Sequence, residues 1–230
     1  MPSSFQAPSS NASISSSYRR PNASRILLWS VFLLIVLGLT APSAQAQGEG
    51  DYADLAALVT PGEEHRAMAE EAGEFNYQST LWMIPGQPPA VSEGESVRQV
   101  ILDGRYIRED LTGDIMGQPF SGIGISGYDR VSKQYRSIWI DSMGTGMLSF
   151  IGTPSEEDER TVVYQGDFVN PMTQQNEAIR SVYTTVSADE QHFFYYVTAP
   201  GSEERLQMKI IYWRKGSERP PAAKGEPAAE

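Results

Sequence analysis

The strongest constraint on the fold of this chain is a two-residue period of apolar side chains that turn signals interrupt at short intervals. Phe75, Tyr77, Leu81 and Met83 alternate with polar residues. Every second side chain of an extended strand points to the same face, so this pattern is typical of a half-buried strand. After Gly86, clusters of Gly, Pro, Asn and Asp recur about every 8–12 residues, which is the spacing of sandwiches and barrels.

The pattern predicts about ten short strands. We expect them at residues 74–83, 91–102, 105–115, 120–128, 134–143, 146–152, 160–169, 178–187, 192–199 and 205–214. Sequential hairpins leave exposed edges unless the sheet closes on itself. The expected fold is therefore all-β, a closed antiparallel up-and-down barrel of eight to ten strands. A barrel of this size encloses either packed side chains or a ligand cavity, and the sequence leaves both open.

One helix is expected before the strands. Thr60 fits the N-cap, Pro61 the first helical position and Glu63 the acid of a capping box. Gly73 is suited to end it. One face of this helix carries His65, Met68, Ala69 and Ala72. We expect the 61–72 helix to lie across one mouth of the barrel.

The N-terminal segment has the pattern of a signal peptide. Three arginines precede an apolar run at residues 26–39, and Ala44-Gln45-Ala46 supplies a small-residue cleavage site. The run is shorter than the roughly 20 residues of a spanning helix. We expect cleavage after Ala46, export to the periplasm or the medium, and no stable membrane insertion afterwards. An uncleaved membrane anchor is the alternative, and the general and twin-arginine export routes both remain open.

The rest of the chain divides into three parts. Residues 47–59 are expected to be a flexible leader, residues 60–215 a single barrel domain, and residues 216–230 a disordered tail rich in Pro, Ala and Glu.

Charge and composition exclude several classes of partner. The net charge is −11, and it becomes −14 without residues 1–46, which hold three arginines and no acid. Such a chain repels nucleic acid and anionic lipid. It has no cysteine and two histidines, so thiolate chemistry and a three-histidine metal site are excluded. We expect no cofactor, no metal and no catalytic residue.

Large apolar side chains suggest a ligand site. Trp139 and Asp141 stand two residues apart on one strand, so we expect both to point into the barrel, with Asp141 near its mouth. A stacking surface beside a charged anchor is typical of a small-ligand site. The candidate ligand-binding residues are Trp82, Trp139, Asp141, Met143 and Tyr195. Such side chains also fill cores, and that interpretation stays open.

Three motifs have simpler explanations than chemistry. Gly122-Ile123-Gly124-Ile125-Ser126-Gly127 matches a dinucleotide-binding motif but lacks the flanking strand and helix, so its glycines indicate close side-chain approach. Asp141, Ser142 and His192 supply triad residue types without a nucleophile elbow. His192 beside an aromatic strand is also the residue type that ligates haem, although a hydrogen bond to the adjacent turn is the simpler interpretation.

Four charged residues lie within or beside strands that also carry apolar side chains, namely Arg105, Glu109, Arg136 and Arg180. We expect them to point outward, with an interior anchor for a ligand carboxylate as the alternative.

A series of short motifs resembles the bacterial domain-of-unknown-function family 1579. These are Pro61 with Glu64-His65, Gly73-Glu74-Phe75, Leu102-Asp103-Gly104-Arg105, MGQPFSGIGISGYDRVSKQYRSIWIDSMGTG at residues 116–146, and Pro171-Met172-Thr173. Phe75 stands where the family usually has Trp. The resemblance covers about residues 60–215 and implies a calycin-like or lipocalin-like barrel without an established activity.

The leading hypothesis is a barrel that binds a small apolar or amphipathic ligand without catalysis. An enzyme that uses carboxylate and phenol groups inside the barrel, and an interaction module with a filled core, are the alternatives. The oligomeric state stays open.

Overall fold

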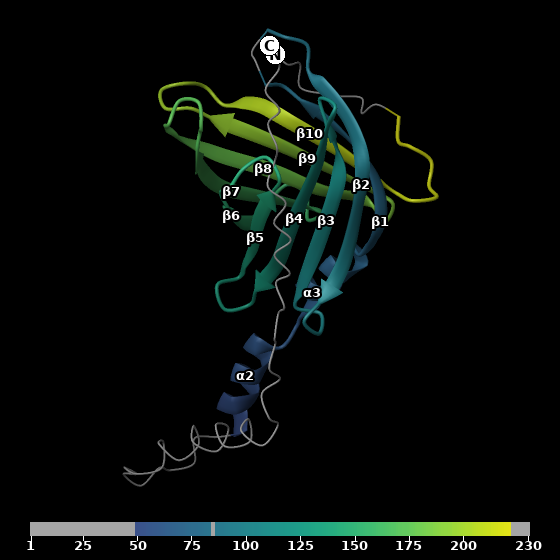
Figure 1. Cartoon of the computed structure of the whole chain (residues 1–230). Helices are drawn as coiled ribbons and strands as arrows, with labels where there is room; N and C mark the ends of the chain where they lie inside the picture. Colours follow the sequence, from purple (N-terminus) through teal and green to yellow (C-terminus); the bar gives the residue numbers. More distant parts are fainter. Residues whose placement is uncertain (1–48, 84–85, 222–230) are drawn as a thin grey trace, which may run out of the picture. The chain divides into compact units, whose positions relative to one another are not determined.

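Ten antiparallel strands close into one barrel in the computed structural model, which describes residues 49–83 and 86–221. Each strand pairs with its neighbour in the chain, and β1 pairs with β10 to close the sheet (Figure 1). The strands are β1 Gly73–Leu81, β2 Ala90–Ile101, β3 Tyr106–Ile115, β4 Gln118–Asp129, β5 Gln134–Asp141, β6 Leu148–Pro154, β7 Thr161–Val169, β8 Asn176–Ser187, β9 Glu190–Thr198 and β10 Arg205–Arg214. The predicted up-and-down barrel is confirmed. The expected signal peptide lies outside the described residues.

The hairpin turns lie close to the expected positions, because their residues adopt the left-handed backbone that tight turns need. Leu102, Asp103 and Gly104 all have positive φ between β2 and β3, as do Met116 and Gly117 between β3 and β4. Asp and Gly tolerate this left-handed backbone better than most residues, which is why such pairs mark tight turns.

A β-bulge makes the last strand depart from its expected period. Met208 pairs with Tyr195, but Leu206 already pairs with Tyr196, so the register shifts between them. Leu206 therefore does not share a face with Met208, although strict alternation along residues 205–214 would place them on the same face. A bulge adds one residue to one strand and reverses the side-chain direction beyond it.

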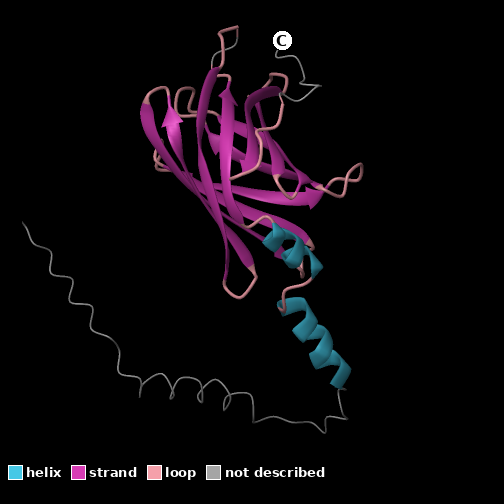
Figure 2. Ribbon diagram, turned by 90° about the vertical axis from the view of Figure 1, so that its right-hand side faces the viewer, coloured by secondary structure: helices cyan, strands magenta, loops and turns pink. Residues whose placement is uncertain are grey.

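Among the described residues, two helices precede the barrel, α2 at Glu49–Val59 and α3 at Glu63–Glu70 (Figure 2). Residues 49–59, which were expected to belong to a flexible leader, are helical. The side chains of residues 54–59 are exposed, and Arg130 donates to the carbonyl oxygens of Ala57 and Thr60. Within the described part of the chain, neither helix has the length or apolar character needed to span a bilayer.

The predicted helix at one barrel end is present as α3, but its first turn is built differently. Its N-cap is Gly62 rather than Thr60, and the Gly62 amide donates to Nδ1 of His65 at 3.1 Å. His65 and Met68 are buried, and His65 meets the ring of Tyr128 edge-on at 6.1 Å between centroids. We call this the α3 end of the barrel and the opposite one the far end.

The densest packing lies on one wall of the barrel, formed by β1, β3 and β10. Its buried cluster consists of Phe75, Tyr77, Leu111, Ile210 and Tyr212. The facing residues of β2 and β3 are small where these rings pass, because a Cβ atom on Gly94 or Gly113 would overlap Tyr77. The core is thus offset to one side of the barrel.

The start of the expected C-terminal tail contacts the barrel through Arg219. Arg219 donates to Glu93 at 2.9 Å and its guanidinium lies over the ring of Trp213 at 5.3 Å. Residues 222–230 lie outside the described residues.

Candidate functional site

Trp139 lies flat on two glycines inside the barrel. It pairs with Gly124 across β4 and β5, and its ring packs against the buried core cluster. A Cβ atom on Gly122 would overlap the indole ring, and one on Gly124 would stand 3.4 Å from it. The glycines of the dinucleotide-like motif therefore make room for a tryptophan, which confirms the interpretation of close side-chain approach.

Asp141 holds the indole and the following turn together. Its Oδ2 accepts from Trp139 Nε1 at 2.8 Å, and its Oδ1 accepts from the Met143 amide at 2.9 Å. Both side chains point the same way, as the two-residue period predicts, and Trp139 is half-buried rather than fully buried. This bonding fixes the ring orientation and satisfies both carboxylate oxygens.

Tyr195 faces the same interior from β9. It pairs with Ser181 and Met208, both of which are interior positions. Burial raises the pKa of its phenol, and the carboxylates of Glu177 and Asp141 raise it further. Glu177 is itself 3% exposed and accepts from Asn170 Nδ2 at 2.7 Å. Two interior carboxylates and a phenol therefore gather near the far end.

The wall opposite the packed core is incompletely covered. The interior-facing side chains of β5, β6 and β7 are half-buried, in contrast to those of the core cluster. They include Tyr135, Ser137, Phe150 and Tyr164. Burial raises the pKa of Tyr164, and Gly152 lies under its ring. This wall presents aromatic surface and phenol groups to the interior.

An interior arginine crosses the barrel at the α3 end. Arg98 of β2 is 5% exposed and donates to Glu109 at 3.1 Å, to Tyr183 at 2.9 Å and to Gln191 at 2.8 Å. Its guanidinium also lies over the ring of Tyr212 at 4.5 Å. Glu109 was expected to point outward, which is wrong: it faces Arg98 and accepts a second bond from a serine of β2.

Glu71 extends from the end of α3 into this cluster. Its carboxylate accepts from the Tyr183 hydroxyl at 3.2 Å and from the Thr185 hydroxyl at 3.1 Å. Burial raises the pKa of Glu71, although Arg98 and the two hydroxyls oppose that effect. The residue is half-buried as a whole because its backbone caps the helix, while its carboxyl end is enclosed.

Residues 60–214 match the family described as protein of unknown function, DUF1579. The chain belongs to this family. The predicted resemblance is therefore confirmed over nearly the whole expected segment.

Comparison with solved structures supports the fold of this DUF1579 protein. Rv2717c from M. tuberculosis superposes with a TM-score of 0.51 at 14% identity, over 68% of this chain and 99% of that one. A redesigned β-barrel matches with a TM-score of 0.33 at 16% identity, over 65% of this chain and 96% of the design. No curated protein sequence was found to match. The first similarity shows a shared barrel fold.

The structure brings three of the five predicted site residues of the DUF1579 chain together. Trp139, Asp141 and Tyr195 share the interior. Met143 is 64% exposed in the loop after β5. Trp82 follows the outward face of β1 and lines an outer groove of about 300 Å³ with His192 and Trp213. The two-residue period places Trp82 on the face opposite Tyr77 and Leu81, so alternation along the strand already indicated that it points outward.

Neither histidine joins the interior carboxylates in a catalytic arrangement. His192 points outward and its Nε2 lies 2.6 Å from Glu190, so the structure does not bring Asp141, Ser142 and His192 together. Ser142 accepts from the Ser121 amide at 3.1 Å. Among residues 54–83 and 86–221, no group of three His, Asp or Glu side chains is arranged to hold a metal ion.

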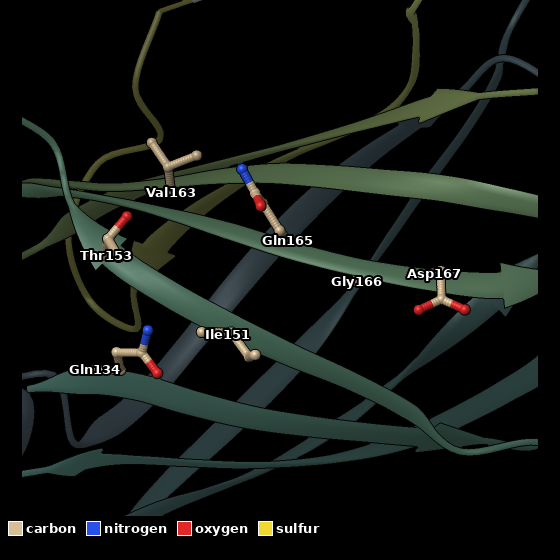
Figure 3. A pocket seen from close by; sticks show the side chains of 7 residues that line it. All are labelled: Gln134, Ile151, Thr153, Val163, Gln165, Gly166 and Asp167. Carbon is tan, nitrogen blue, oxygen red and sulfur yellow. The ribbon is translucent and has the colours of Figure 1, made fainter. Parts of the chain in front are cut away.

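A second outer groove, of about 500 Å³, runs over β5 to β7 (Figure 3). Its lining is Gln134, Ile151, Thr153, Val163, Gln165, Gly166 and Asp167. The side chains belong to the outward positions of their strands, so this groove is separate from the interior. Arg136 and Arg180 point outward as expected, and Arg180 pairs with Glu204 at 2.6 Å.

Sequence reasoning missed Arg98 and Glu71. The hairpin register could have identified Arg98. Counting back from the turn at residues 102–105 places Arg98 opposite Glu109, and Glu109 shares a strand face with the apolar residues Ile107 and Leu111. No sequence signal identifies Glu71, since it becomes interior only through the position of α3.

Proposed function

We propose that the barrel interior binds a small amphipathic molecule without catalysing its conversion. The observation that carries this proposal is the half-buried interior wall of β5, β6 and β7, which lies across the barrel from the packed core on β1, β3 and β10. Aromatic rings on the inside of a barrel that remain open to solvent are suited to an apolar body. The site would comprise Trp139, Asp141 and Tyr195.

Unbonded phenols support an amphipathic rather than a purely apolar ligand. Burial and nearby charges raise the pKa values of Tyr164 and Tyr195, and no hydrogen bond to either hydroxyl contributes. Among the described residues, Gln191 Nε2 is the one side-chain nitrogen or oxygen that is fully buried without a partner. Neither hydroxyl oxygen is fully buried, so each can donate to an acceptor on a ligand.

The engaged state of the interior carboxylates argues for binding over catalysis. Glu71, Glu109, Asp141 and Glu177 each accept hydrogen bonds from protein donors. Bonds to protein donors hold these side chains in place, so we assign them a role in orienting a ligand and no proton transfer.

The test fills the open wall with one side chain. Ser137 points inward from β5, and Ser149 points outward from neighbouring β6. Ser137→Phe should abolish binding of an apolar fluorescent probe, whereas Ser149→Phe should leave it unchanged. Equal probe binding by both variants, or none by the wild type, would contradict interior binding and favour the filled-core interaction module.

We also propose export with cleavage after Ala46, on the signal-peptide pattern of residues 1–46. Mass spectrometry of the protein from its own cells should find Gln47 as the first residue. Recovery of the intact N-terminus from a membrane fraction would support the anchor instead.

A further inference from the structure

The loops at the far end of the barrel differ in charge from those at the α3 end. Alternate hairpins of an up-and-down barrel lie at the same end. The α3-end turns all contain charged residues; these are 102–105, 130–133, 155–160 and 188–189. Four adjacent far-end loops contain no Asp, Glu, Lys, Arg or His in their described residues, namely 82–83 with 86–89, 116–117, 142–147 and 170–175.

The same four loops expose methionine. Five methionines stand there, and we call them the methionine rim: Met83 (45% exposed), Met116 (68%), Met143 (64%), Met147 (61%) and Met172 (92%). The chain has 8 methionines in all. Five exposed methionines in four uncharged loops at one end are a composition suited to contact with an apolar partner.

Nearby acids are turned away from the rim. Asp114 accepts from the Gly117 amide at 2.5 Å, and Asp141 accepts from the Met143 amide and the Trp139 indole. The last far-end loop, residues 199–204, is the exception: it carries Glu203 and Glu204, of which Glu204 is paired with Arg180. The rim is thus joined directly to the aromatic interior through Asp141.

We propose that the methionine rim docks on the surface of an uncharged, zwitterionic lipid assembly. Its loops offer no charge to a charged partner, and the net charge of −11 repels anionic lipid. Methionine is flexible and polarisable, which suits a fluid apolar surface. Entry of the amphipathic ligand from that surface into the barrel rests on the proposed function, whereas docking itself does not.

The experiment measures co-flotation with phosphatidylcholine vesicles. The protein should begin at Gln47, because the apolar run at residues 26–39 would bind lipid by itself. Every strand and the α3 contacts lie within that part, so it holds the complete barrel. The test variant replaces all five rim methionines with Gln. The control replaces two exposed apolar residues at the α3 end with Gln in the same way; these are Leu102 (66% exposed) and Val131 (68% exposed).

The wild type and the control should float with the vesicles. The rim variant should partition at least about tenfold less, because the free energy gained by even partial burial of several methionine side chains exceeds ~1.4 kcal/mol. Failure of the wild type to float, or equal flotation of the rim variant, overturns lipid docking; a protein partner for the rim would then be sought. Probe binding in vesicle-free solution reports the interior separately.

Oxidation gives a second measurement on the unmutated chain. Peroxide converts methionine to its polar sulfoxide, and this chain has no cysteine to compete. Oxidation of the rim, verified by peptide mass spectrometry, should abolish flotation, and methionine sulfoxide reductases should restore it. Flotation that survives complete rim oxidation also overturns the proposal.

Discussion

At the scale of single residues, two glycines on one strand make different demands. A Cβ atom at Gly122 would overlap the Trp139 ring, which the bond to Asp141 holds in place, but at Gly124 it would reach ordinary contact. Gly122→Ala should cost about 1–3 kcal/mol through overpacking, and Gly124→Ala should be nearly neutral. Urea unfolding of both variants checks this. Equal stability of the two would mean that Trp139 moves freely.

Glu71 gives a pH dependence whose sign follows from its raised pKa. The folded protein keeps the Glu71 proton above the ordinary pKa of 4.5, so the neutral form stabilises the fold below 4.5. That contribution is lost as pH rises through the raised pKa. Glu71→Gln imitates the neutral form at every pH. Its melting temperature relative to wild type should therefore rise as the pH increases from 4.5 through the raised pKa of Glu71. A difference that stays constant with pH would refute this.

At the scale of elements, α3 depends on a buried histidine for its start. His65 accepts the Gly62 amide and packs against Tyr128. His65→Ala should cost about 1–2 kcal/mol, from the lost cap and the lost packing. Arg66→Ala, at an exposed position of the same helix, is the matched control. Thermal melts measure this, and an equal decrease of the melting temperature in both variants would show that the cap is unimportant.

At the scale of the whole molecule, Arg98 links strands from opposite sides of the barrel. It bonds Glu109 of β3, Tyr183 of β8 and Gln191 of β9. Arg98→Met should cost about 3–5 kcal/mol, because it leaves the Glu109 carboxylate without its cation. Adding Glu109→Gln should recover part of that loss. Chemical unfolding of the single and double variants measures the coupling. Additive losses would mean that the ion pair is incidental.

The sequence alone predicted the barrel and most strand positions, because alternation and turn chemistry are local properties. It also predicted that Trp139 and Asp141 share a face, since two residues on one strand always do. It failed where a local pattern was interrupted or absent. The bulge before Met208 reversed Leu206, and the exposed helix α2 has no apolar face to reveal it.

Tertiary structure decided which polar groups lie inside. Strand β2 carries Glu93 and Glu95 on one face and Ser96 and Arg98 on the other, so its alternation does not distinguish interior from exterior. Its direction is fixed by pairing with β1 and β3, whose apolar residues must face the core. The gathering of four uncharged loops at one end likewise depends on closure of the sheet. Local physics thus determined the strands, and long-range pairing determined the interior and the rim.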